Sequence, residues 1–321
     1  NIAIGYSAAN GFDTENHNLA IGTDALGGSV AGGEYNVAVG NFSLDALTSA
    51  DANVAVGYQA GSAVTTGIYN TLVGYQSGLA TTEGAQNTFL GRVAGGANTT
   101  GGVNIAIGDG AYDAADTESN NLAVGVNALG GAVAGGEFNV AVGNTSLDAL
   151  TSGDYNVAIG YAAGSDLTSG ERNTFIGNDA GKDCIGGGQN VAIGDNAGGG
   201  ALSTAAGRNV MIGRNAGQAG TSAEHNIFVG FEAGKSVTTG TYSVFIGPNA
   251  GDDHDTEGSN IGIGFAALGG SIAGGENNVA LGIYSLDALT SGDDNIAIGY
   301  QAGSANTSGG QNIYIGRDAG L

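Results

Sequence analysis

The chain has 321 residues, of which 64 are glycine, 1 is proline and none is tryptophan, while 41% are apolar. High glycine without a three-residue period excludes collagen, and the regular Val and Ile content argues against a disordered chain. Thirty carboxylates outnumber seven basic residues, and the net charge of −23 disfavours nucleic acid and anionic membranes as partners, because both bind through Lys and Arg.

The cysteine content and the ends of the sequence set further expectations. Cys184 is the only cysteine, so no intrachain disulfide forms, and we expect it to be a small buried or loop residue. No apolar run is long enough to span a bilayer, so we predict no membrane insertion in this segment. The sequence starts at Asn1 and ends at Leu321 within repeats, and we expect one continuous domain over 1–321 that belongs to a longer protein.

A five-residue word, Asn-x-x-(Ile/Val/Leu)-Gly, recurs 19 times. In chain order the words begin at residues 1, 18, 36, 53, 70, 87, 104, 121, 139, 156, 173, 190, 209, 226, 243, 260, 278, 295 and 312. Fourteen of the 18 spacings are 17 residues, three are 18 and one is 19. Each word predicts a short strand, and no helix of useful length fits between words. We therefore predict an all-β parallel β-solenoid of about 19 coils with a 17-residue period.

The first and fifth residues of each word are predicted to form the turns. The first is Asn in 18 copies and Ser243 in the other, and the fifth is Gly in all 19. Gly supplies positive φ, and stacked Asn side chains can form a ladder that satisfies backbone groups. Three residues after the Gly stands Ala in fifteen copies and Ser in four. The predicted turn residues include Asn1, Gly5, Asn18, Gly22, Asn53, Gly57, Asn156, Gly160, Asn295 and Gly299.

The alternation within each word predicts which side chains face the core. The second and fourth residues, such as Val54 and Val56, share one face, and we predict that this mostly β-branched pair points into the coil. The third residue then points outward, where a row of large apolar side chains would form an interface between neighbouring solenoids. The alternative is that these side chains cover a wide core. The third residue is large in Leu72, Phe89, Phe175, Met211, Phe228, Phe245 and Tyr314.

A longer unit of several coils also repeats. Segments that begin ALGG and end SLDALTS occupy residues 25–49, 128–152 and 267–291, and each of the three 18-residue coils contains an ALGG sequence. The residues between words are rich in Gly, Ser, Thr, Asp and Glu. We expect any recognition of a cell-surface glycan or protein to lie in these variable loops.

The repeated words, among them NVAIGYAAG, NTFIGNDAG and NIAIGYQAG, resemble two related groups of proteins. One is the head of trimeric autotransporter adhesins, and the other is the repetitive shaft of phage tail-fibre-like proteins. The resemblance covers the whole chain and implies a left-handed β-roll, a homotrimer, and an extracellular location on a cell surface or virion. The 17-residue coil is longer than the adhesin-head coil and closer to that of the tail-fibre shaft.

Catalytic chemistry is not expected. His17, His225 and His254 lie in different loops without a Ser or Cys nucleophile in a strained turn, so we expect isolated surface histidines. No cofactor is predicted; calcium could bind rows of carboxylates, but the calcium-binding nonapeptide is absent and no ligand residue can be named. A polysaccharide depolymerase is a remote alternative that would use paired loop carboxylates, drawn from Asp252, Asp253, Asp293 and Asp294.

These observations together predict a structural or adhesive fibre segment, either a tail-fibre shaft or a surface adhesin head, that mediates attachment or host recognition. The predicted partner is the chain itself, as a homotrimer or another homo-oligomer. The alternative is a glycan- or cation-binding module carried on the solenoid loops. An enzyme is not predicted.

Overall fold

The computed structural model describes residues 1–11, 15–28, 32–131, 135–200, 207–270 and 274–321. In this part of the chain the fold is all-β, with 19 parallel strands that form a β-solenoid of about 17 residues per turn and with no helix. The predicted fold class is therefore confirmed. Each predicted word supplies one three-residue strand, formed by its second, third and fourth residues.

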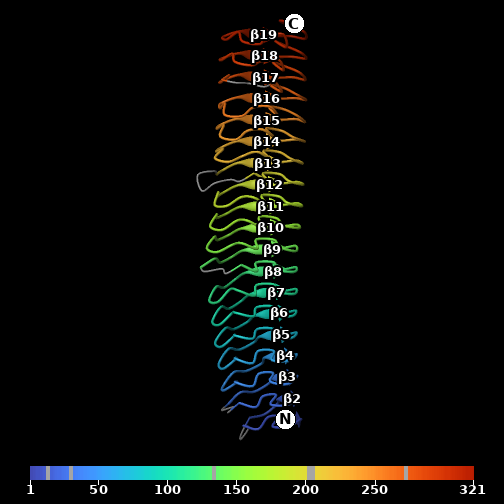
Figure 1. The fold of residues 1–321 in the computed structure, drawn as a ribbon, viewed down its shortest axis with the longest axis vertical. Helices are drawn as coiled ribbons and strands as arrows, with labels where there is room; N and C mark the ends of the chain where they lie inside the picture. The colour runs from blue at the N-terminus through green and yellow to red at the C-terminus, as the bar shows by residue number, and fades with distance from the viewer. Residues whose placement is uncertain (12–14, 29–31, 132–134, 201–206, 271–273) are drawn as a thin grey trace. The chain divides into compact units, whose positions relative to one another are not determined.

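The strands, labelled in Figure 1, divide between two compact units, residues 1–156 and residues 157–321. The first unit contains β1 (Ile2–Ile4), β2 (Leu19–Ile21), β3 (Val37–Val39), β4 (Val54–Val56), β5 (Thr71–Val73), β6 (Thr88–Leu90), β7 (Ile105–Ile107), β8 (Leu122–Val124) and β9 (Val140–Val142). The second contains β10 (Val157–Ile159), β11 (Thr174–Ile176), β12 (Val191–Ile193), β13 (Val210–Ile212), β14 (Ile227–Val229), β15 (Val244–Ile246), β16 (Ile261–Ile263), β17 (Val279–Leu281), β18 (Ile296–Ile298) and β19 (Ile313–Ile315).

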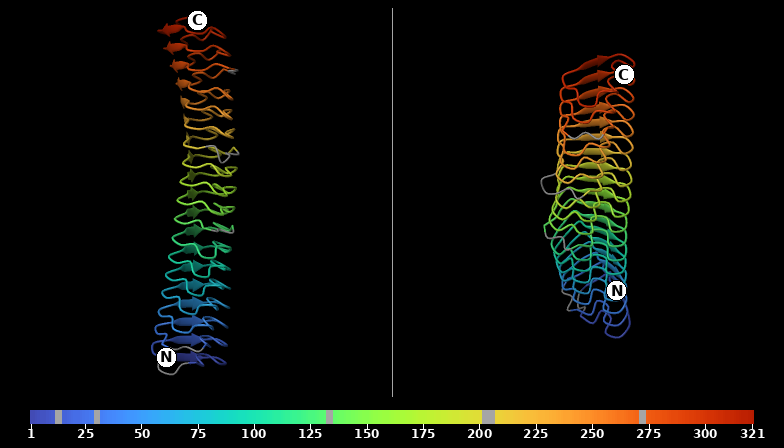
Figure 2. Two further views of the ribbon diagram at one scale, coloured as in Figure 1. Left: turned by 90° about the vertical axis from the view of Figure 1, so that its left-hand side faces the viewer. Right: turned by 45° about the horizontal axis from the view of Figure 1, so that its top comes forward.

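Within each unit, every strand pairs in parallel with the strand of the next coil, and the words stay in register. Val54 of β4 lies opposite Thr71 of β5, and Val56 lies opposite Val73. The strands of a unit consequently stack along one side of its coils (Figure 2). Equivalent word positions therefore form straight columns of side chains.

The first residue of each word forms a buried ladder. The backbone N–H of Asn53 donates to Oδ1 of Asn36 at 3.0 Å, and the N–H of Asn70 donates to Oδ1 of Asn53 at 2.9 Å. The amide nitrogen Nδ2 of Asn53 also donates to the carbonyl oxygen of Gly67 at 2.9 Å. One side chain thus satisfies backbone groups in its own coil and in the next coil. The predicted ladder is confirmed, and Ser243 keeps its acceptor role, with Oγ 3.3 Å from the N–H of Asn260.

The fifth residue of the word must be glycine for two reasons. Gly57 has φ +142°, a conformation that side-chain-bearing residues rarely adopt. A Cβ atom at Gly57 would also collide with the carbonyl group of Gly74 in the next coil. The parallel stack brings these glycines together in every coil, so the predicted turn role of Gly is confirmed.

The third residue of each strand lies in the core, which contradicts the prediction that it faces outward. Ala55 is fully buried, whereas Val56 beside it is 36% exposed. Six of the seven large residues assigned to an exposed interface row are buried, namely Leu72, Phe89, Phe175, Met211, Phe228 and Phe245. Tyr314 is half-buried. The β-branched pair instead points to solvent, and the prediction that it forms the interior is wrong.

The reason for this orientation is that a second column shares the narrow core with the third residues. This column lies four residues after the word's glycine, and a large residue in either column is always matched by a small one in the other. Gly95 packs on the ring of Phe89, and a Cβ at Gly95 would collide with that ring. In the coil of Leu44, which is fully buried, the third residue is only Ala38. The same exchange holds for every large third residue, in the pairs Leu72–Gly78, Phe89–Gly95, Phe175–Gly181, Met211–Gly217, Phe228–Gly234, Phe245–Gly251 and Tyr314–Gly320.

This exchange predicts the outcome of a core swap. Phe89→Ala should destabilise the first unit by about 3–5 kcal/mol, because it leaves a cavity in a close-packed interior. Adding Gly95→Leu should restore most of the loss, because Leu44 occupies the equivalent position at φ +49° and Gly95 has φ +61°. Amide hydrogen exchange of the β5–β7 coils would measure both effects.

Gly95→Leu alone is the matched control for this swap. It should destabilise the same coils, because the new side chain meets the intact Phe89 ring. If the double variant were no more stable than Phe89→Ala, the two columns would not share one space.

Candidate functional site

The described residues contain no group of three or more His, Cys, Asp or Glu side chains placed to hold a metal ion. The four carboxylates considered for polysaccharide cleavage do not form one cluster in the sequence, because Asp252 and Asp253 are about two coils from Asp293 and Asp294. Asp293 has a role in its loop, since Oδ1 accepts the backbone N–H of Glu276 at 2.9 Å. This carboxylate supports the neighbouring coil.

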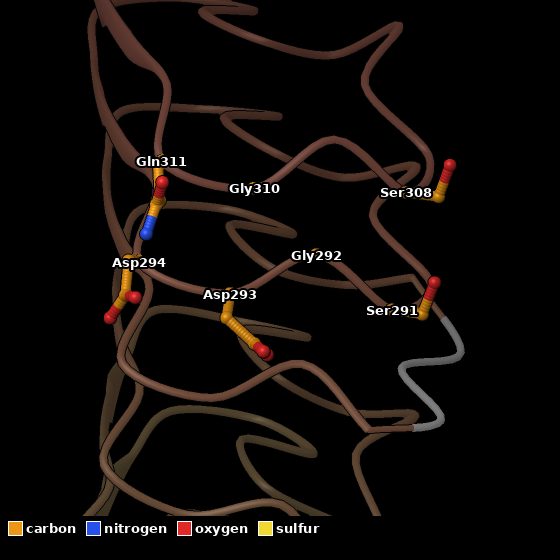
Figure 3. A pocket seen from close by; sticks show the side chains of 7 residues that line it. All are labelled: Ser291, Gly292, Asp293, Asp294, Ser308, Gly310 and Gln311. Carbon is orange, nitrogen blue, oxygen red and sulfur yellow. The ribbon is translucent and has the colours of Figure 1, made fainter.

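A shallow polar trough of about 320 Å³ lies in the second unit, on the loops that precede β18 and β19 (Figure 3). Ser291 and Ser308 border one side, and Asp294 and Gln311 border the other (Figure 3). Its lining offers hydroxyl, carboxylate and amide groups, so it can exchange several hydrogen bonds with a polar ligand. It contains no histidine, cysteine or lysine that could act as a base or nucleophile. The complete lining is Ser291, Gly292, Asp293, Asp294, Ser308, Gly310 and Gln311.

The most extensive surface feature is formed by the second and fourth residues of the strands, which we call the sheet face. Its 38 positions carry 35 Ile, Val or Leu residues, and none is charged. Within β7 the exposed fractions are 41% for Ile105 and 38% for Ile107. Thr occupies the other three positions, at Thr71, Thr88 and Thr174. Monomeric proteins rarely expose a continuous apolar patch larger than a few hundred Å².

The histidines differ in their surroundings, and the expectation of three surface histidines is wrong for His254. His254 is fully buried, with its ring centroid 4.8 Å from that of Phe245 and both ring nitrogens without a hydrogen-bond partner. Burial lowers its pKa to about 4, although the nearby Glu257 charge acts in the opposite direction. The equivalent position holds Leu150 in another coil, so His254 occupies an aliphatic site of the core. His17 is exposed and His225 is half-buried.

Three buried glutamates have structural roles that the sequence analysis missed. Oε2 of Glu118 accepts the N–H groups of Asp116 and Thr117 at 3.0 and 3.1 Å, and Oε1 accepts the N–H of Gly135 in the next coil at 2.9 Å. Glu15 and Glu257 make the equivalent contact to the next coil, in which Glu15 accepts the N–H of Gly32 and Glu257 accepts the N–H of Gly274. The available signal was the Asp-Thr-Glu sequence that precedes each ALGG coil.

Electrostatics agree with this structural role for Glu257. Burial alone would raise the pKa of Glu257, but backbone N–H groups and the Thr256 hydroxyl donate to the carboxylate and hold the pKa below its ordinary value. The carboxylate is therefore kept ionised where it joins two coils.

Cys184 is buried as expected, and burial raises the pKa of its thiol to about 12, which makes it unreactive as a thiolate.

No protein-family model matches the chain, and no curated protein is significantly similar to it. In the residues that the structure describes, no helix is long and apolar enough to cross a membrane. The candidate functional features in the described residues are the sheet face and the loop trough.

Acidification is expected to destabilise the second unit partly through His254. Its pKa is about 4 in the fold and 6.5 ordinarily, so between these values the unfolded chain binds a proton that the folded chain does not. The contribution to stability is complete above pH 6.5 and is lost as the pH falls towards 4, by up to about 3 kcal/mol. His254→Leu should remove this share of the acid sensitivity, measured by urea unfolding across that range.

His225→Leu is the control for loss of a histidine outside the core, because this ring is half-buried, stacks on Tyr242 with a centroid separation of 5.0 Å and lies 3.6 Å from a carboxylate oxygen of Glu224. It should not remove the acid sensitivity that His254→Leu removes. An unchanged pH profile for His254→Leu would show that the buried imidazole does not contribute.

Proposed function

We propose that the chain is a structural segment of an extracellular fibre, which spaces or presents an attachment surface on a cell or virion. The observation that carries this proposal is the use of its buried groups to join each coil to the next. The asparagine ladder, the parallel strand register and the buried glutamates all connect adjacent coils. Such a repeat gains stability by adding coils, as a spacer requires.

The surface chemistry also supports a fibre. A net charge of −23 makes separate molecules repel one another in solution, except where they meet through uncharged surface. The resemblance of the repeated words to adhesin heads and tail-fibre shafts makes attachment and homo-oligomerisation part of this proposal. Within the described residues, Asp293, Glu118 and Glu257 accept backbone N–H groups of an adjacent coil and so support the stack.

A second candidate function is glycan binding by the loops, and the polar trough favours it. Hydroxyl, carboxylate and amide groups on two adjacent loops suit the hydroxyl groups of a neutral saccharide. A glycan array would test it with the unmodified chain and with an Asp294→Ala/Gln311→Ala variant. Signal that disappears in the variant would support this function, and equal signal from both chains would place binding elsewhere.

Deletion of one complete coil tests the structural proposal. Removing residues 70–86 joins Tyr69 to Asn87 and keeps the repeat in phase. Phe89 then takes the place of Leu72 beside Gly61, and the missing side chain at Gly61 leaves room for the ring. We expect fibres that assemble and attach as before and are shorter by about 4.8 Å. Electron microscopy and a surface-attachment assay would measure length and function.

Deletion of residues 70–78 alone is the control, because it breaks the register and should prevent assembly. If the in-phase deletion abolished attachment while assembly remained normal, a specific site in that coil would replace the spacer function. Cleavage of polysaccharide by the purified chain would establish the depolymerase alternative.

A further inference from the structure

The sheet face avoids charge in a chain that is otherwise strongly acidic. The sequence contains 37 charged Asp, Glu, Lys and Arg residues, and none occupies the 38 outward strand positions. These positions are half-buried or exposed in the described strands. Solubility alone would favour polar residues here, as it does on the rest of the surface. The aliphatic composition of 35 of the 38 positions therefore indicates that the face is covered.

Two columns flank this face and carry a second compositional signal. One consists of the residues immediately before each word, and the other of the residues immediately after the word's glycine. They contain five of the seven basic residues but only three of the thirty acidic ones, Asp109, Asp195 and Asp294. They also contain nine of the twelve tyrosines, at Tyr6, Tyr35, Tyr58, Tyr69, Tyr75, Tyr155, Tyr161, Tyr242 and Tyr300.

The flanking columns thus have the composition of a protein interface. Tyr and Arg are enriched at interfaces and Asp and Glu are depleted, because aromatic rings bury a large apolar area and the planar guanidinium group is more weakly hydrated than an ammonium group. Tyr69 and Tyr161 are exposed, at 57% and 59%. The Arg214 guanidinium lies over Phe231 at 5.1 Å and that of Arg317 over Tyr300 at 5.2 Å, so these groups present planar surfaces.

The extent of the face meets the requirement of a stable complex. In the first unit alone, two outward residues on each of nine strands give 18 aliphatic or Thr side chains, before the flanking columns are added. A standard interface uses about 20–30 residues and about 800 Å² on each side. The sheet face with its flanking columns reaches this size within either unit considered by itself.

Charge and periodicity identify the partner as a second copy of this chain. A partner recognised through its charge would contact the carboxylates outside the face and not the uncharged strand positions. An uncharged face can meet an identical face without opposing like charges. Both faces also repeat at the same strand spacing of about 4.8 Å, so their aliphatic columns can interdigitate over many coils.

We propose that the sheet face is the surface through which two copies of this chain pack, aliphatic face against aliphatic face, with the Tyr- and Arg-rich columns at the rim. This inference rests on the proposed fibre function and assigns the contact to the second and fourth strand residues. The large third residues, which lie in the core, do not take part.

Analytical ultracentrifugation of the purified chain tests the assignment. The unmodified chain should associate at micromolar concentration. A variant with Ile105→Lys, Ile107→Lys, Ile296→Lys and Ile298→Lys places charges on the face of each unit, and its association should weaken at least 100-fold, as expected when unpaired charges are buried. Circular dichroism should show an unchanged fold, since all four side chains point to solvent.

A matched variant carries the same number of lysines in exposed loop positions, as Thr66→Lys, Thr100→Lys, Thr239→Lys and Thr307→Lys. It should associate as tightly as the unmodified chain or more tightly, because it lowers the negative charge. Raising the salt concentration from about 0.05 M to about 0.5 M should also strengthen association of the unmodified chain, since salt screens repulsion between two acidic molecules.

Several results would overturn the assignment. The first is an unmodified chain that remains monomeric at tens of micromolar. The second is undiminished association of the variant with four lysines on the sheet face. The third is a loop variant whose association weakens as much as that of the face variant. Failure here is distinct from failure of the fibre function. A chain that stays monomeric while the in-phase coil deletion still assembles and attaches would remain a fibre segment with a different partner on this face.

Discussion

The buried asparagine at the start of each word joins every coil to its neighbours. Its side chain accepts an N–H from the next coil and donates to a carbonyl oxygen in the loop of its own coil, as Asn53 does toward Asn70 and Gly67. Backbone hydrogen bonds also run from loop to loop, as from the N–H of Gly61 to the carbonyl oxygen of Ser77 at 2.9 Å, and the buried asparagine bonds join these loops to the strand column. The glycine turn, the register and the straight side-chain columns all depend on this repeated connection.

The narrow core then decides how the surface is used. Its volume is divided between the third strand residue and the residue four positions after the glycine, and a large side chain at one requires a small one at the other, as in Phe89 with Gly95 and Ala38 with Leu44. No room remains for the β-branched pair, which is placed outside. The solvent-facing side of the strands, where polar residues are usual in soluble proteins, is therefore an uncharged aliphatic face bordered by tyrosine and arginine. Packing inside the coil thus creates the feature that favours assembly.

Charge is distributed to suit the same arrangement. Buried carboxylates such as Glu118 connect coils, and loop carboxylates such as Asp293 support neighbouring loops. The remaining acidic groups lie mainly away from the sheet face and its flanking columns. A chain built in this way carries its negative charge mainly on its loops and offers a neutral surface on its strands. His254 is an exception, because its neutral imidazole occupies an aliphatic position of the core.

The period and the spacing of the words were enough to predict a parallel solenoid, its 19 strands and the roles of Asn and Gly, because these depend on local backbone conformation and on repetition. The alternation within a strand could show that the second and fourth residues share a face, but not which face is inside, since a period of two is symmetric. Only the closed coil decided this, through the volume that Phe89 and Gly95 share. That decision moved the candidate interface from Leu72, Phe89 and their equivalents to the aliphatic pair beside them.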